Sequence, residues 1–191
     1  MPLFDHFSWL APIYDRFAKP KDDNHFVDFA GLPTAGRLLD VGGGTGRVAY
    51  SLRGKAFQLI VVDLSFEMLR QAIAKPGLLP VNAYSEVLPF PDGSFDCVIM
   101  VDALHHVVNQ AQTARELWRV LRPGGRIVIE EPDIRTFLVK LIAVGEKVLL
   151  MRSHILNPSQ IAGLFPPPAR VRVEARDYRV WVIVERSASN G

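Results

Sequence analysis

The stretch Leu38-Leu39-Asp40-Val41-Gly42-Gly43-Gly44-Thr45-Gly46 decides the fold class of this chain. An apolar run, typical of a buried strand, ends in an acidic residue and leads directly into a glycine-rich loop. Glycines let the backbone adopt positive φ and approach a ligand closely, and a helix that starts there offers unpaired N–H groups. The stretch therefore predicts a strand, a ligand-binding loop and a helix, in that order.

The chain on either side of this loop alternates short apolar runs with amphipathic helical patterns. Helical spacing covers residues 46–53, 65–75 and 110–121, and Ser65 is a suitable N-cap. This alternation is typical of a parallel sheet with crossover helices. Two final apolar runs, separated by four residues, predict an antiparallel hairpin. The expected strands are Leu38–Val41, Leu59–Val62, Pro80–Ala83, Val98–Val101, Ile127–Ile129, Val171–Ala175 and Val180–Val184.

The residues around the glycines restrict the kind of ligand. A dinucleotide fingerprint needs glycine at the first, third and sixth positions, and the sixth position counted from Gly42 is Arg47. A phosphate-binding P-loop is excluded because no Lys-Ser or Lys-Thr pair follows the glycines. The Asp40 carboxylate would repel a phosphate but pair with an ammonium group. Asp63 ends the next strand, where it can accept hydrogen bonds from ribose hydroxyls. A ligand with a ribose and a cationic group, but no phosphate, fits this pattern.

Four blocks in this order resemble the class I S-adenosylmethionine-dependent methyltransferases, and in particular the quinone-biosynthesis (methyltransferase type 11) branch. They are the glycine loop at 40–46, the acidic residue Asp63, the segment 85–96 (Ser-Glu-Val-Leu-Pro-Phe-Pro-Asp-Gly-Ser-Phe-Asp), and the segment 121–126 (Leu-Arg-Pro-Gly-Gly-Arg). The resemblance implies a Rossmann-like α/β fold with a seven-stranded, mostly parallel sheet in the order 3-2-1-4-5-7-6. The last strand of the hairpin would be antiparallel, and helices would cover both faces.

The resemblance also implies S-adenosyl-L-methionine as the cofactor and S-adenosyl-L-homocysteine as the product. Residues around the loop would bind the methionine part, Asp63 the ribose, and other residues would line the adenine pocket. One position departs from the family pattern, because Tyr84 stands where an Asp usually accepts a hydrogen bond from the adenine amino group. The predicted cofactor-binding residues are Asp40, Gly42, Gly43, Gly44, Gly46, Asp63, Leu64, Met68, Ser85, Glu86 and Val101.

Candidate catalytic residues follow the fourth predicted strand, where open α/β sheets bind their ligands. His105 or His106 could act as a general base, since an imidazole titrates near neutral pH. The alternative is that one packs under the cofactor while the other starts a helix. A third candidate, Tyr14, lies in an aromatic segment similar to the family's lid over the cofactor. That segment could equally be an amphipathic helix on the sheet.

The acceptor is predicted to be a small molecule, apolar or aromatic, methylated on O, N or C. The segment from Phe137 to Met151 is apolar on too many faces for an ordinary surface helix. It could wall a lipophilic acceptor site, or belong to the core or to a homodimer interface. A non-catalytic cofactor-binding protein and a nicotinamide-dependent oxidoreductase are the alternatives, and Arg47 disfavours the second.

Composition narrows the class of protein further. The 191 residues, 49% of them hydrophobic, fit one globular domain, and the net charge of +2 gives no clustered basic face for nucleic acid. The single Cys97 excludes an intramolecular disulfide and favours the cytoplasm, and no Cys/His cluster has metal spacing. No stretch is long and apolar enough to span a membrane. The expected divisions are a helical lid at 1–35, a cofactor-binding core at 36–133, substrate-side helices at 134–168 and a closing hairpin at 169–187.

Overall fold

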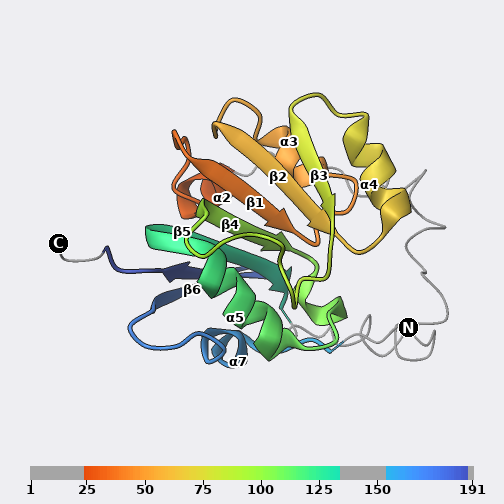
Figure 1. The fold of residues 1–191 in the computed structure, drawn as a ribbon. Helices are drawn as coiled ribbons and strands as arrows, with labels where there is room; N and C mark the ends of the chain where they lie inside the picture. Colours follow the sequence, from red (N-terminus) through yellow and green to blue (C-terminus); the bar gives the residue numbers. More distant parts are fainter. Residues whose placement is uncertain (1–23, 134–153, 189–191) are drawn as a thin grey trace.

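The computed structural model describes residues 24–133 and 154–188, which form a seven-stranded sheet with helices on both faces (Figure 1). The strand order is β3-β2-β1-β4-β5-β7-β6, as predicted. The first five strands are parallel, whereas β7 runs antiparallel to both β5 and β6. The strands are β1 Arg37–Val41, β2 Gln58–Asp63, β3 Leu78–Asn82, β4 Phe95–Val101, β5 Leu121–Pro132, β6 Arg170–Arg176 and β7 Arg179–Glu185.

The helices divide between the two faces of the sheet. Side chains of α2, α3 and α4 belong to one buried apolar cluster, and side chains of α5 and α7 belong to the other. Their bounds are α2 Asn24–Phe29, α3 Arg47–Ser51, α4 Phe66–Ile73, the 3-10 turn η1 Leu104–His106, α5 Gln110–Val120 and α7 Pro158–Ala162.

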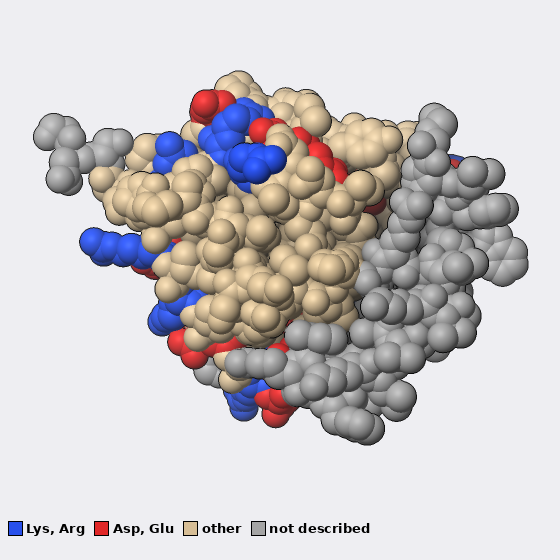
Figure 2. Space-filling view, turned by 90° about the horizontal axis from the view of Figure 1, so that it is seen from below, with Lys and Arg blue, Asp and Glu red and all other residues tan. Residues whose placement is uncertain are grey.

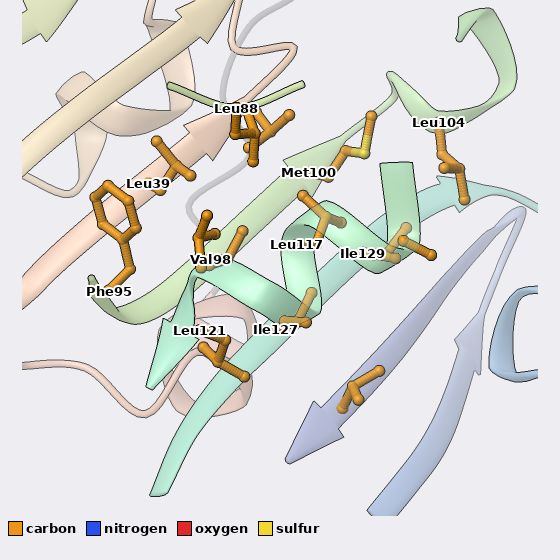
Figure 3. Packing of buried hydrophobic residues seen from close by; sticks show 14 of the residues in the cluster. Leu39, Leu88, Phe95, Val98, Met100, Leu104, Leu117, Leu121, Ile127 and Ile129 are labelled. Carbon is orange, nitrogen blue, oxygen red and sulfur yellow. The ribbon is translucent and has the colours of Figure 1, made fainter. Parts of the chain in front are cut away.

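The central strands are buried on both faces because their side chains alternate between these two clusters. In β1, Leu38 packs with the α2–α4 cluster, and Leu39 and Val41 pack with the α5–α7 cluster. Figure 3 shows the second cluster, where Leu117 of α5 lies against the side chains of β4 and β5. Continuous apolar runs in the sequence are therefore the expected signature of these strands.

Local signals in the sequence explain where the helices begin and end. Ser65 caps α4 and accepts a hydrogen bond from Met68 N, as predicted. Helix α5 ends at Val120, and the chain continues directly into β5 from Leu121, although Gly124 within this strand has φ +77°. Strand β5 is consequently much longer than the predicted Ile127–Ile129, with a register shift beside Phe95 and Cys97 of β4.

Two of the predicted divisions fall largely outside the described residues. Of the segment 1–35, the structure describes α2 and the turn that follows it, and of 134–168 it describes 154–168 with α7. The predicted lid residue Tyr14 and the apolar segment from Phe137 to Met151 both lie outside. Among the described residues, no helix has the length and apolar character required to cross a bilayer.

Candidate active site at the carboxyl edge of the sheet

The glycine loop lies at the carboxyl edge of the sheet, where β1, β2 and β4 end. Gly42, Gly44 and Gly46 have φ values of +69°, +56° and +72°, a region that strongly favours glycine. A Cβ at Gly46 would lie 2.5 Å from the side chain of Leu78, and one at Gly43 would lie 2.7 Å from the Asp40 carboxyl. These glycines therefore allow the loop to pack tightly onto β1–β3.

Gly44 differs from the other glycines of the loop because the described residues leave open space beside it. Among them, a Cβ at Gly44 would meet only the Asp63 carboxylate at 3.9 Å and the Met68 sulfur at 4.0 Å. The loop backbone, an acidic side chain and a thioether thus border one point at the carboxyl edge. A ligand can contact bare backbone at this point, which is what the sequence pattern predicted for the loop.

The Asp63 carboxylate ties the end of β2 to the loop. Its Oδ2 accepts a hydrogen bond from Gly44 N at 2.8 Å, and its Oδ1 accepts one from Ser65 N at 2.8 Å. These bonds fix the carboxylate beside Gly44, and it remains partly exposed. It is therefore preorganised at the position where the resemblance places the ribose.

The Asp40 carboxyl lies beneath the loop. It is 1% exposed and accepts a hydrogen bond from Ala49 N at the start of α3. Burial raises its pKa to about 7, against a smaller lowering effect from Ala49 N–H, and the nearby charge of Asp63 raises it further. Arg47, whose buried Nε has no hydrogen-bond partner within residues 24–133 and 154–188, lowers this pKa slightly. Asp40 is thus a buried carboxyl group that gains or loses its proton near neutral pH.

The predicted adenine-side residues divide into two groups. Leu64 is 48% exposed at the end of β2, Met68 is buried in α4 beside Gly44, and Tyr84 is 53% exposed after β3. The side chains of Ser85 and Glu86 instead contact the region around α5: the Ser85 hydroxyl lies 3.1 Å from that of Thr113, and Glu86 accepts a hydrogen bond from Asn109 N. The side chains of Ser85 and Glu86 are thus bonded to α5 and to its N-cap residue Asn109.

The two candidate histidines lie in η1, just beyond β4 and Val101. His105 is buried, and its Nδ1 lies 2.5 Å from Glu131 Oε2 at the end of β5. The His106 ring lies 3.9 Å from the His105 ring, between centroids. Burial, reinforced by His105, lowers the pKa of His106 to about 4, so His106 is neutral at physiological pH.

The histidine turn contacts the glycine loop directly. A Cβ at Gly42 would lie 2.6 Å from the Cβ of Ala103, the residue before η1. The loop and the turn meet between β1 and β4, where the strand order reverses. Ligands of open α/β sheets bind at this switch point. The cofactor-side and histidine-side predictions therefore converge on one site.

A second set of polar residues at the same edge was not predicted from the sequence. Asp102 has φ +51°, and Arg179 of β7 pairs with both Asp102, at 3.1 Å, and Glu130. Trp181 Nε1 donates to Glu130 at 3.0 Å. Burial raises the pKa of Glu130, although Arg179 opposes the shift. The available signal was the pair Glu130-Glu131 directly after an apolar run, but the side-chain partners of this pair come from Ala103, η1 and β7.

The fold and the comparisons with known proteins support a class I S-adenosylmethionine-dependent methyltransferase. Residues 39–129 match the methyltransferase domain family. It is 36% identical over 157 residues to the ubiquinone/menaquinone biosynthesis C-methyltransferase UbiE of Hahella chejuensis, covering 69% of this chain and 62% of that relative. The corresponding protein of Pseudomonas fluorescens is 36% identical over 115 residues, covering 55% and 45%. The chain thus spans about half to three fifths of the length of these relatives.

Solved structures share the fold at low sequence identity. A methyltransferase from Thermotoga maritima superposes with a TM-score of 0.75 at 20% identity, covering 95% of this chain and 98% of that one. A methyltransferase of Haloferax volcanii, solved with the Trm112 methyltransferase activator, gives a TM-score of 0.77 at 17% identity and covers 97% and 99%. At this identity the agreement concerns the fold.

The site fits the cofactor that the family implies, S-adenosylmethionine, with S-adenosylhomocysteine as product. Gly44 leaves an open cradle of backbone, and the fixed Asp63 carboxylate beside it suits a ribose diol. When bound, the cofactor supplies a methyl group on a positively charged sulfur. Among the described residues, no group of three or more His, Cys, Asp or Glu is placed to hold a metal ion.

Proposed function

We propose that this chain transfers a methyl group from S-adenosylmethionine to a small apolar or aromatic acceptor. The observation that carries the proposal is the open cradle at Gly44, bordered by Asp63 and Met68 and joined to the histidine turn through the contact between Gly42 and Ala103. We assign cofactor binding to Asp40, the glycine loop, Asp63, Leu64, Met68, Val101 and the backbone of Ser85 and Glu86. His105 is the proposed general base.

The chain's own residues supply orientation and a dry environment. The cradle holds the cofactor at the switch point, and the buried side chains of η1 limit water on the acceptor side. Displacement at a methyl group needs the acceptor atom in line with the bond that breaks, so positioning accounts for much of the expected acceleration. Tyr14 remains a further candidate for contact with the acceptor.

The acceptor class rests on composition and on the relatives. The UbiE relatives act in ubiquinone/menaquinone biosynthesis as C-methyltransferases, and we infer a similarly apolar, ring-containing acceptor here. We also propose that residues 1–35 form a lid and that 134–168 contribute the acceptor side, in a single cytoplasmic domain. Figure 2 shows charges of both signs at the margins of the face seen from below and mainly uncharged residues across its middle. On that face, the described residues form no extended basic patch suited to nucleic acid.

Calorimetry with three ligands tests the cofactor assignment. We expect S-adenosylmethionine and S-adenosylhomocysteine to bind, and NAD not to bind. Binding of NAD alone would make the chain a nicotinamide-dependent protein, as considered from the sequence. Incubation with methyl-labelled cofactor and a panel of phenols, hydroquinones and their non-hydroxylated analogues then tests transfer. Cofactor binding without transfer to any acceptor would favour the non-catalytic binding protein.

A further inference from the structure

The two edge strands of the sheet differ in their capacity to pair with a further strand. At one end, β3 contains Pro80, which has no backbone N–H and interrupts the row of donors along that edge. At the other end, none of the seven residues of β6, Arg170–Arg176, is a proline or a glycine (Figure 1). Among residues 24–133 and 154–188, β7 is the only strand that pairs with β6. Within that part of the chain, the outer edge of β6 therefore presents backbone N–H and C=O groups without a strand partner.

The side chains of β6 form one apolar face and one charged face. The register with β7 places Val171 beside Val184 and Val173 beside Val182, on the side of the sheet that α5 and α7 cover. Val171 is 37% exposed and Val173 is 40% exposed. The charged residues, on the opposite face, are Arg170, Arg172, Glu174 and Arg176. A further strand added to this edge can therefore make apolar pairs on one face and charge pairs on the other.

A second copy of β6 in antiparallel orientation is complementary to the first. Residues directly opposite each other in an antiparallel pair share a face, so the two-fold axis must pass between two copies of the same residue. With the axis at Val173, Arg172 of each copy lies opposite Glu174 of the other. On the apolar face, Val173 lies opposite its own copy and Val171 lies opposite Ala175. Unlike charges and apolar pairs therefore fill the centre of this arrangement.

The neighbouring registers are less favourable. Moving the axis by one residue places Arg172 opposite Arg172, or Glu174 opposite Glu174, and like charges directly opposite each other are destabilising. With the axis at Val173, like charges meet only at the ends of the strand, where Arg170 lies opposite Arg176. Both arginines are exposed, so water and salt screen their repulsion. The central charges thus select one register.

We propose that two copies of this chain associate through β6, so that their sheets continue across the two-fold axis. In a single copy, Arg172 Nε lies 3.7 Å from Glu174 Oε1 along the same strand, and the side chains are 60% and 46% exposed. Arg172 also lies over the Phe29 ring, at 5.5 Å from its centroid. These exposed contacts leave both charged groups accessible to an opposing strand. Since one strand of seven residues forms a small interface, the association should depend on protein concentration.

The proposed interface is separate from the candidate active site. Strands β5 and β7 lie between β6 and β4, and the glycine loop follows β1 on the far side of β4. Monomer and dimer should therefore bind S-adenosylmethionine with the same affinity. The association does not depend on the proposed methyl transfer, so either proposal can fail without the other.

Charge reversal on β6 tests both the interface and its register. Arg172→Glu places glutamates opposite each other, and Glu174→Arg places arginines opposite each other. Each variant should raise the Kd of the dimer by about tenfold or more, measured by sedimentation equilibrium of the full chain. An equimolar mixture of the two variants should associate again, because both unlike pairs are restored in the mixed dimer. Arg115→Glu on α5 and Glu67→Arg on α4 make the same changes in net charge at exposed positions and should leave the Kd unchanged.

Oxidation of cysteine variants reads the register directly. Residues directly opposite each other in an antiparallel pair have Cα atoms about 4.5–5.5 Å apart, within the range of a disulfide. Val173→Cys should therefore form a covalent dimer when oxidised with diamide. Ala175→Cys should not, because the two copies of residue 175 lie four positions apart along the strands. The native Cys97 is buried, so the wild-type protein supplies the background.

Three results would overturn pairing through β6. They are a wild-type protein that stays monomeric at every concentration, a dimer whose Kd neither charge reversal changes, and a covalent dimer in Ala175→Cys but not in Val173→Cys. Circular dichroism of the dilute variants checks that each is folded. If the wild-type monomer protects the amides of β6 from hydrogen exchange equally at all concentrations, another segment of the same chain covers this edge, and the dimer is excluded.

Discussion

The two halves of the site are held in place by different kinds of interaction. On the cofactor side, bare glycine backbone packs against β1–β3, and Asp63 bonds to the backbone of Gly44. On the proposed acceptor side, charged side chains set the geometry, with the buried Glu131 on His105 and the partly exposed Arg179 on Asp102. The cofactor side therefore tolerates little change in its backbone, whereas the proposed acceptor side depends on the charge state of its side chains.

The largest effect that follows from this difference is expected on the cofactor side, in Gly46→Ala. The alanine would occupy a left-handed conformation at φ +72° and place its Cβ 2.5 Å from Leu78. Left-handed backbone costs about 1–2 kcal/mol and overpacking about 1–3 kcal/mol, so the free energy of unfolding should fall by about 2–5 kcal/mol. Denaturant unfolding measures the change.

Gly44→Ala is the matched control, because it has a similar φ but open space at the Cβ. It should lose only the backbone cost, about 1–2 kcal/mol of stability, while its affinity for S-adenosylmethionine falls at least tenfold. Equal stability losses in the two variants would show that crowding at Gly46 is unimportant.

The next effect concerns how the free energy of unfolding depends on pH. Asp40, on the cofactor side, and His106, in the histidine turn, should contribute with opposite signs. Asp40 in the folded protein has its pKa raised to about 7, so the folded state holds a proton that the unfolded state releases near pH 4. Its contribution to stability therefore decreases as pH rises from about 4 to 7. His106 has its pKa lowered to about 4 from 6.5, so the unfolded state binds the extra proton, and its contribution increases as pH rises through the same range.

Single variants should separate these two contributions, each on the order of 3 kcal/mol at 1.36 kcal/mol per pKa unit. Between pH 4 and 6.5, Asp40→Asn should become more stable relative to wild type as pH rises. His106→Asn should become less stable relative to wild type over the same range. Urea unfolding at several pH values measures both slopes. Parallel curves for wild type and either variant would contradict the corresponding pKa shift.

Asp63→Asn should reduce cofactor binding with a smaller effect than these. The amide keeps one oxygen for a backbone N–H but loses the charge that strengthens hydrogen bonds from ribose hydroxyls. A loss of about 1.5–3 kcal/mol corresponds to about 10- to 150-fold in Kd, measured by calorimetry with S-adenosylhomocysteine. Asn82→Ala tests the same region, since Asn82 bonds only to the carbonyls of Asp63 and Leu64 in the described structure. The Kd of Asn82→Ala for S-adenosylhomocysteine should stay within about threefold of wild type. A loss as large as that of Asp63→Asn would show that the end of β2 has loosened.

The sequence predicted the strand order and the place of the glycine loop because their signals are local or follow family spacing. The glycine loop, Ser65 and the alternating apolar runs each lie within a few consecutive residues, and the antiparallel hairpin follows from its short connection. The acceptor side was predicted only as far as His105 and His106. The partner of His105 lies 26 residues further along, and Arg179 lies 77 residues from Asp102. Such pairs depend on strand register, which a single sequence does not specify at residue level.

The smallest effect concerns Tyr84, where this chain departs from the family pattern. Tyr84 is 53% exposed at the proposed adenine edge, so a hydrogen bond made there competes with water and contributes about 1 kcal/mol at most. Tyr84→Asp should therefore retain cofactor binding, with Kd within about fivefold of wild type in either direction, and Tyr84→Phe should separate the ring from the hydroxyl. If the ring stacks on the adenine, Tyr84→Phe binds like wild type and Tyr84→Asp binds more weakly. If the hydroxyl is the acceptor, the order reverses. Complete loss of binding in Tyr84→Asp would show that the aromatic side chain is required, which would extend side-chain control from the acceptor side to the adenine edge.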